Sequence, residues 1–198
     1  MTLDLYLALL GFALVTVITP GPNNLMLMAS GANFGFRRSI PHMLGVGLGF
    51  PLMIIPVGLG VMQLFDLWPV SYTILKVLSV LYMLYLAWKI ANAAPPKDAA
   101  KPGSKPLTFL QASAFQWVNP KAWSMALGAI TLYAAGRDFP YVLLVAGTYV
   151  AMGCISTTTW TVIGQQVRRL LNKPKRLRLF NLAMAALLVA SLLPVLGL

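Results

Sequence analysis

The stretch Thr19-Pro20-Gly21-Pro22-Asn23-Asn24 interrupts a long apolar run near the start of the chain. A continuous α-helix cannot pass through it, because proline lacks the amide N–H that the helix needs and its ring clashes with the preceding turn. The residue before each proline is also pushed toward extended backbone. Inside a bilayer, unpaired backbone groups are tolerated only where protein buries them or where they line a polar cavity. The stretch therefore predicts a broken helix and a candidate site.

The composition is that of an integral membrane protein. Of the 198 residues, 59% are hydrophobic and 10% are charged, and the mean hydropathy is +0.77, far from the values of soluble domains. The net charge of +11 resides in short segments without the aromatic residues of a recognition module, so we expect a lipid bilayer and no nucleic acid as partner. The single Cys154 cannot form a dithiol pair, and we expect neither a metal nor a cofactor.

Six apolar spans can be delimited, each near or above the roughly 20 residues that a bilayer requires. The first is broken at residues 19–22, and the fourth is broken at Asn119-Pro120-Lys121. We therefore predict an all-α membrane protein with six transmembrane helices, of which the first and fourth are broken. The spans cover residues 3–34, 39–61, 70–88, 107–133, 141–164 and 179–198.

The two halves of the chain resemble each other weakly. Laying Pro22 on Pro120 shifts the sequence by 98 residues, and with nearly the same shift Pro41 meets Pro140. Proline breaks at corresponding places are typical of internally repeated transporters. With three spans in each half, the copies are inverted. The predicted organisation is a first three-helix repeat at 1–92, a Pro- and Lys-rich cytoplasmic linker at 93–106 and a second three-helix repeat at 107–198.

Basic residues occur in alternate loops, and loops rich in Lys and Arg face the cytoplasm. We therefore predict that both termini face the periplasm. The basic loop residues are Arg37 and Arg38; Lys89, Lys97, Lys101 and Lys105; and Arg168, Arg169, Lys173, Lys175, Arg176 and Arg178.

The two breaks carry the predicted chemistry. A half-helix that begins after a break directs unpaired N–H groups and the positive end of its dipole into the gap, where a carboxylate is favoured. Lys121 adds a cation to the gap, although its side chain could instead snorkel to a membrane surface. Asn23 adds an amide, although it could instead cap its own helix. Thr157 belongs to a run of hydroxyls that either line a pathway or bond back to their own helix. The predicted substrate-binding residues are Pro20, Gly21, Pro22, Asn23, Asn24, Asn119, Pro120, Lys121 and Thr157.

The motifs resemble those of the LysE/RhtB family of amino-acid exporters. The resemblance rests on Thr-Pro-Gly-Pro-Asn-Asn-Leu at 19–25, Gly-Phe-Arg-Arg-Ser at 35–39, Leu-Gly-Val at 44–46, Leu-Gly-Phe at 48–50 and Asn-Pro-Lys at 119–121. It implies efflux of amino acids across the bacterial inner membrane, driven by the proton gradient. Relatives often have an aspartate where this chain has Phe50, and this departure resembles the branch that exports cysteine and O-acetylserine.

Proton coupling lacks an obvious carboxylate. The four acidic residues, Asp4, Asp66, Asp98 and Asp138, lie at span ends or in loops. The candidates that remain are Lys121, His42, Asp4 and the substrate itself. A histidine titrates near neutral pH, but we expect His42, close to the Arg37-Arg38 turn, to be interfacial.

The sequence thus predicts an exporter of small neutral amino acids that works by alternating access and is not an enzyme. The sequence is also compatible with a homo-oligomer. The rivals are an uncoupled channel, an assembly subunit that needs no polar groups at the breaks, and a membrane thiol oxidoreductase, for which Cys154 alone is insufficient.

Overall fold

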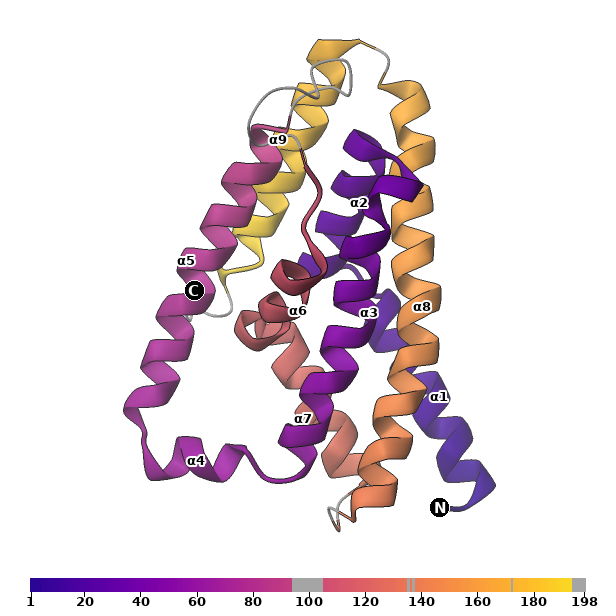
Figure 1. The fold of residues 1–198 in the computed structure, drawn as a ribbon, viewed down its shortest axis with the longest axis vertical. Coiled ribbons are helices and arrows are strands. Elements are labelled where there is room, and N and C mark those ends of the chain that lie inside the picture. Colours follow the sequence, from indigo (N-terminus) through magenta and orange to yellow (C-terminus); the bar gives the residue numbers. More distant parts are fainter. Residues whose placement is uncertain (94–104, 135, 137, 172, 194–198) are drawn as a thin grey trace.

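All regular structure in the described residues is helical, which confirms the predicted all-α class (Figure 1). The structure, a computed structural model, describes residues 1–93, 105–134, 136, 138–171 and 173–193. Most of the predicted linker at 93–106 and the position of Arg137 lie outside these ranges. The proposed division into two repeats therefore stays a prediction.

The first predicted break is present. Helix α1 (Leu3–Ile18) and helix α2 (Pro22–Phe34) meet at an angle of 57°. Gly21 between them is fully extended, with φ −175° and ψ −179°. Pro22 occupies the first position of α2, where the missing N–H costs nothing because that group has no partner within a helix.

The second predicted break lies at Asn119, between helix α6 (Phe109–Val118) and helix α7 (Pro120–Tyr133). Asn119 is extended and caps α7, since its side-chain oxygen accepts a hydrogen bond of 3.1 Å from the backbone N–H of Lys121. The two breaks thus use the same local chemistry, a proline at the start of the second half-helix.

The remaining helices surround these two broken pairs. In Figure 1, α8 runs the full height of the molecule beside α2, α3 and α1, while α5 and α9 lie side by side across the bundle. The short α4 crosses the lower end and joins α3 to α5. Their bounds are α3 Phe36–Gly58, α4 Met62–Leu67, α5 Val70–Ala91, α8 Phe139–Leu170 and α9 Pro174–Ala190.

Within the described residues, three helices are long and apolar enough to cross a bilayer: α3, α5 and α8. The bent pair α1 and α2 makes a fourth if it counts as one span. The predicted fourth span is divided at Asn119, and α9, with 17 residues, ends at Ala190 inside the predicted sixth span, of which residues 194–198 lie outside the described part. The six-span inverted arrangement therefore stays a prediction.

Glycines allow the closest helix contacts. A Cβ added at Gly31 on α2 or Gly164 on α8 would collide with the backbone carbonyl of the other helix. On α3, a Cβ at Gly45 would lie 2.5 Å from the Phe109 oxygen, and one at Gly49 would lie 2.6 Å from the Cα of Ser113. These contacts agree with the packing role that small residues have in membrane helices.

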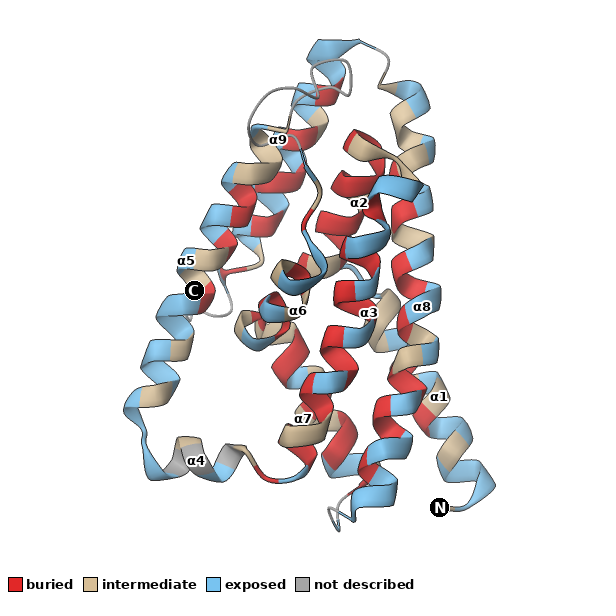
Figure 2. Cartoon of the chain, viewed as in Figure 1, coloured by how far each residue is buried: buried red, intermediate tan, exposed pale blue. Residues whose placement is uncertain are grey.

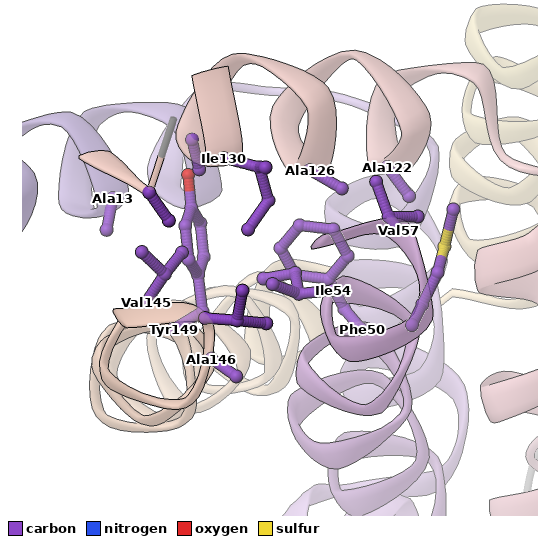
Figure 3. Packing of buried hydrophobic residues seen from close by; sticks show 14 of the residues in the cluster. Ala13, Phe50, Ile54, Val57, Ala122, Ala126, Ile130, Val145, Ala146 and Tyr149 are labelled. Carbon is purple, nitrogen blue, oxygen red and sulfur yellow. The ribbon is translucent and has the colours of Figure 1, made fainter. Parts of the chain in front are cut away.

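The principal core lies between α1, α3, α7 and α8, next to the first break. Figure 3 shows Phe50 and Ile54 of α3 close to Tyr149 of α8 and Ile130 of α7. The rings of Phe50 and Tyr149 meet edge to face, with centroids 5.1 Å apart. By contrast, α5 exposes most of its apolar side chains (Figure 2), as expected for a helix that faces lipid.

Candidate functional site

The end of α1 is held by side chains from other helices. Because the last turn of a helix has carbonyls without helix partners, it needs donors from elsewhere. Asn24 donates from Nδ2 to the carbonyls of Val17 (2.9 Å) and Thr19 (2.8 Å). From α8, Ser156 donates to the carbonyl of Val17 (2.7 Å), and the indole N–H of Trp160 donates to that of the last residue of α1 (3.1 Å). The break is therefore a built polar junction.

Lys121 connects the second break to the first. Its ammonium donates to the carbonyl of Thr19 and, at 3.5 Å, to that of Pro20. Its aliphatic stem crosses Gly21 so closely that a Cβ there would lie 2.7 Å from the Lys121 Cδ. The half-buried side chain thus points to the end of α1. The ammonium is thus hydrogen-bonded to backbone of the other broken pair, which favours the site interpretation of Lys121 over snorkelling.

Asn23 forms a reciprocal amide pair with Gln116 of α6. The Asn23 Nδ2 donates to the Gln116 Oε1 (2.8 Å), and the Gln116 Nε2 donates to the Asn23 Oδ1 (3.2 Å). The N-cap of α2 is Gly21, which makes no side-chain cap, so the capping interpretation of Asn23 is wrong. Asn23 instead bridges α2 to the other broken pair.

These groups surround a cavity of about 40 Å³, here called the break cavity. Such a volume holds about two or three water molecules, which is less than a whole amino acid occupies. Lys121 is the one ionisable side chain among its lining residues. The predicted site residues in the lining are Gly21, Asn23, Asn24, Asn119, Lys121 and Thr157, and the further lining residues include Thr16, Phe50, Met125 and Ser156.

The three predicted prolines do not line the break cavity. Pro20 and Pro22 interrupt the helix between α1 and α2. Pro120 lies on the other side of α7 and borders a separate apolar cavity of about 360 Å³ with Trp123 and Tyr72. Their part is to create the break and leave backbone groups unpaired. Thr157 donates back to the carbonyl of Cys154 (3.3 Å), as one alternative expected, and it also lines the cavity; its part in a pathway stays a prediction.

The proton-coupling candidates are not brought together. Asp4 is exposed in the first turn of α1, at the far end of that helix from the break. His42 is 1% exposed and lines a different cavity, a burial that the sequence did not indicate; its position at the membrane interface stays a prediction. The reason for the burial is tertiary: α2, α5 and residues 105–107 cover this part of α3.

Sequence reasoning missed Gln116, which is fully buried and pairs with Asn23. Its signal was an amide one turn before the Asn119-Pro120 break, in a largely apolar span. The donor role of Trp160 carried no comparable signal, because a tryptophan in a span is commonly lipid-facing or interfacial.

Comparison with characterised proteins places the chain among transport proteins. It is 29% identical over 192 residues, 96% of each chain, to the cysteine/O-acetylserine efflux proteins of Escherichia coli strain K12 and Shigella sonnei strain Ss046. No solved structure matches it. The family model of the LysE type translocators matches residues 14–192, which include both breaks and every lining residue of the break cavity. The resemblance seen in the sequence motifs is thereby confirmed, and the chain belongs to the LysE type translocator family.

Proposed function

We propose that this protein exports small neutral amino acids or derivatives, of the cysteine and O-acetylserine type, across the bacterial inner membrane. The similarity to efflux proteins with those substrates supports the transport class and the choice of substrate. The break cavity is the proposed binding site. The proposed mechanism is alternating access driven by the proton-motive force.

The observation that carries the proposal is the position of the Lys121 ammonium in a polar junction without a carboxylate. Its present partners are the carbonyls of Thr19 and Pro20. A substrate carboxylate is a stronger acceptor for an ammonium than a neutral carbonyl, because the hydrogen bond then joins two charges. Substrate binding would take Lys121 away from the end of α1, and the two broken pairs would then be free to separate.

The same junction favours uncharged side chains. No carboxylate belongs to the lining of the break cavity, so a cationic side chain such as that of lysine would find no counter-ion there. Burying an unpaired charge is costly. The amide pair of Asn23 and Gln116 and the hydroxyls of Ser156 and Thr157 offer partners to a small polar side chain instead.

The proposed orientation has both termini in the periplasm. The α2–α3 junction, the end of α5 and the α8–α9 turn lie at one end of the molecule, and the N-terminus lies at the other (Figure 1). The first group of segments carries the Lys and Arg excess, which supports a cytoplasmic location for that end.

Export by cells tests the proposal. Cells that express the chain should release O-acetylserine, cysteine or other neutral amino acids into the medium, and a protonophore should stop the release. Lys121→Ala should abolish export at equal membrane content, since losing one partner of a desolvated charge pair weakens binding about 30-fold or more. Lys121→Arg should restore only part, because the guanidinium is a wider planar group.

Three results would each contradict a different part of the proposed function. Export of lysine or arginine without neutral amino acids would overturn the substrate class. Release that follows the substrate gradient and ignores the protonophore would favour an uncoupled channel. Parental export by Lys121→Ala would remove Lys121 from the site.

A further inference from the structure

A second cavity lies nearer the other end of α2 and is distinct from the break cavity. Its volume is about 40 Å³, and α2, α3, α5 and residues 105–107 enclose it. We call it the His42 cavity. Its polar lining residues are Ser30, Asn33, His42, Lys89 and Lys105.

Two of these groups are already satisfied. The hydroxyls of Ser30 and Ser39 share a hydrogen bond of 2.8 Å. The Asn33 amide forms a reciprocal pair with Asn181 of α9, with bonds of 2.7 and 2.9 Å. Neither side chain therefore needs a ligand in the His42 cavity.

His42 and Lys89, by contrast, have no hydrogen-bond partner among the described residues. His42 is 1% exposed, and neither of its ring nitrogens has a hydrogen-bond partner in the described part of the chain. A buried polar group without a partner is costly, and such groups in native proteins call for an explanation. Lys89, half-buried in the last turn of α5, has no ion pair or hydrogen bond with any described residue, and Lys105 is exposed at the same cavity.

The combination of one imidazole and two ammonium groups selects the chemistry of a ligand. Lysine offers only donors, and histidine offers at least one N–H in either protonation state. No carboxylate is present in the lining. The ligand that complements these groups is a small anion, and a carboxylate is of suitable size for the cavity.

The His42 cavity and the break cavity share one face of α2. Met26, Ser30 and Asn33 line the first, Asn23 lines the second, and these positions follow the three- and four-residue spacing of a single helix face. From Asn23 to Asn33 this face is about 15 Å long at the helical rise. Helices α2 and α6 are joined by two kinds of contact. Met26 and Phe115 belong to one apolar cluster, and Asn23 pairs with Gln116.

We propose that the His42 cavity is a second binding site, which captures the carboxylate of the transported amino acid before the substrate moves along α2 to the break. The proposal rests on the proposed function and its orientation. Lys89 and Lys105 attract the carboxylate at the mouth, and His42 donates the inner hydrogen bond.

Uptake into everted membrane vesicles, whose cytoplasmic side faces the medium, tests this site. With radiolabelled O-acetylserine, Lys89→Gln should raise KM about tenfold, the usual effect of losing a hydrogen bond to a charged group, at a near-parental maximal rate. Lys89→Arg should restore most of the affinity. Lys76→Gln is the control on the same helix, because Lys76 is exposed and borders the apolar cavity beside Pro120 instead of the His42 cavity.

The His42→Leu variant distinguishes between two roles of His42, a ligand-binding residue and a buried core residue. A core histidine without partners should be replaced by leucine with unchanged or higher thermal stability and an unchanged KM. A ligand-binding histidine should show the same stability but a several-fold higher KM. Parental KM values in both Lys89→Gln and His42→Leu, with export still lost in Lys121→Ala, would overturn this site and leave the proposed function standing.

A protection experiment that needs no transport tests the anion site even if the proposed transport function is wrong. In the detergent-purified chain, sodium acetate should slow acetylation of Lys89 by an amine-reactive reagent several-fold relative to sodium chloride, with no effect on Lys76. Protection of Lys89 in a protein whose vesicles accumulate no amino acid would overturn the proposed function but retain an anion site. Equal rates in acetate and chloride would overturn the site.

Discussion

At the scale of single residues, the contact between Lys121 and Gly21 is the most informative in the molecule. Gly21 has an extended backbone that any residue can adopt, so a side chain at this position brings no backbone strain. It would instead meet the Lys121 stem, with the Cβ 2.7 Å from Cδ and 3.2 Å from Nζ. A substitution at Gly21 therefore acts on the position of the ammonium and on little else.

We predict that Gly21→Ala lowers export about as severely as Lys121→Ala, because both remove the ammonium from the carbonyls of Thr19 and Pro20. The measurement is O-acetylserine release by cells at equal membrane content. Gly11→Ala on α1, where a Cβ would meet nothing within 4 Å, is the control and should export normally.

Sequence reasoning identified residues that lie together in the fold where a side chain carries its own chemical signal. Asn24, Asn119 and Lys121 stood out from the sequence because amides and a cation are rare inside apolar spans, and all three meet at the junction. It failed for His42 and Gln116, whose environments are made by other helices. His42 lies near two arginines in the sequence but is covered by α2 and α5 in the fold.

At the scale of elements, α2 and α8 form the closest packed pair. A Cβ at Gly31 would collide with the backbone carbonyl of Thr161, and one at Gly164 with that of Met28. Backbone atoms in two packed helices cannot turn aside as the end of a flexible side chain can. The contact therefore sets the distance of α2, and with it Asn23 and Asn24, from α8.

We predict that Gly31→Ala or Gly164→Ala destabilises the folded protein by about 1–3 kcal/mol or more, the usual cost of overpacking. Thermal unfolding in detergent measures it. Gly147→Ala is the matched control on α8, since a Cβ there meets nothing within 4 Å and the residue is exposed; it should unfold at the parental temperature or above. Equal unfolding temperatures in all three variants would contradict the close α2–α8 contact.

The helix breaks were predictable because the effect of proline on a helix is local. Pro22 and Pro120 begin their half-helices as the sequence indicated. The partners of each half-helix were not predictable, because apolar spans carry no pattern that tells which neighbour each face will meet. The reach of Lys121 to α1 and of Asn23 to α6 is a property of that packing.

At the scale of the whole molecule, several contacts support the predicted inverted repeat. Asn23 and Lys121 correspond with the shift of 98 residues, and each reaches the end of the other repeat's first half-helix, at Gln116 and Thr19. Phe50 and Tyr149 differ by 99 residues, as Pro41 and Pro140 do, and they pack against each other. A two-fold axis in the membrane plane would bring a residue of α3 against its own counterpart on α8 in this way.

An inverted repeat with three spans in each half makes a testable prediction about topology, because an even number of crossings returns the chain to the side from which it started. The Lys and Arg excess of alternate loops then determines which side that is. A reporter that is active only in the periplasm should be active when fused after Leu198 and inactive when fused at Lys173. Fusions to the unaltered chain at matched expression provide the measurement. Activity at Lys173 but not at Leu198 would reverse the orientation, and activity at both would mean that α9 does not cross the bilayer, so that the six-span repeat would have to be abandoned.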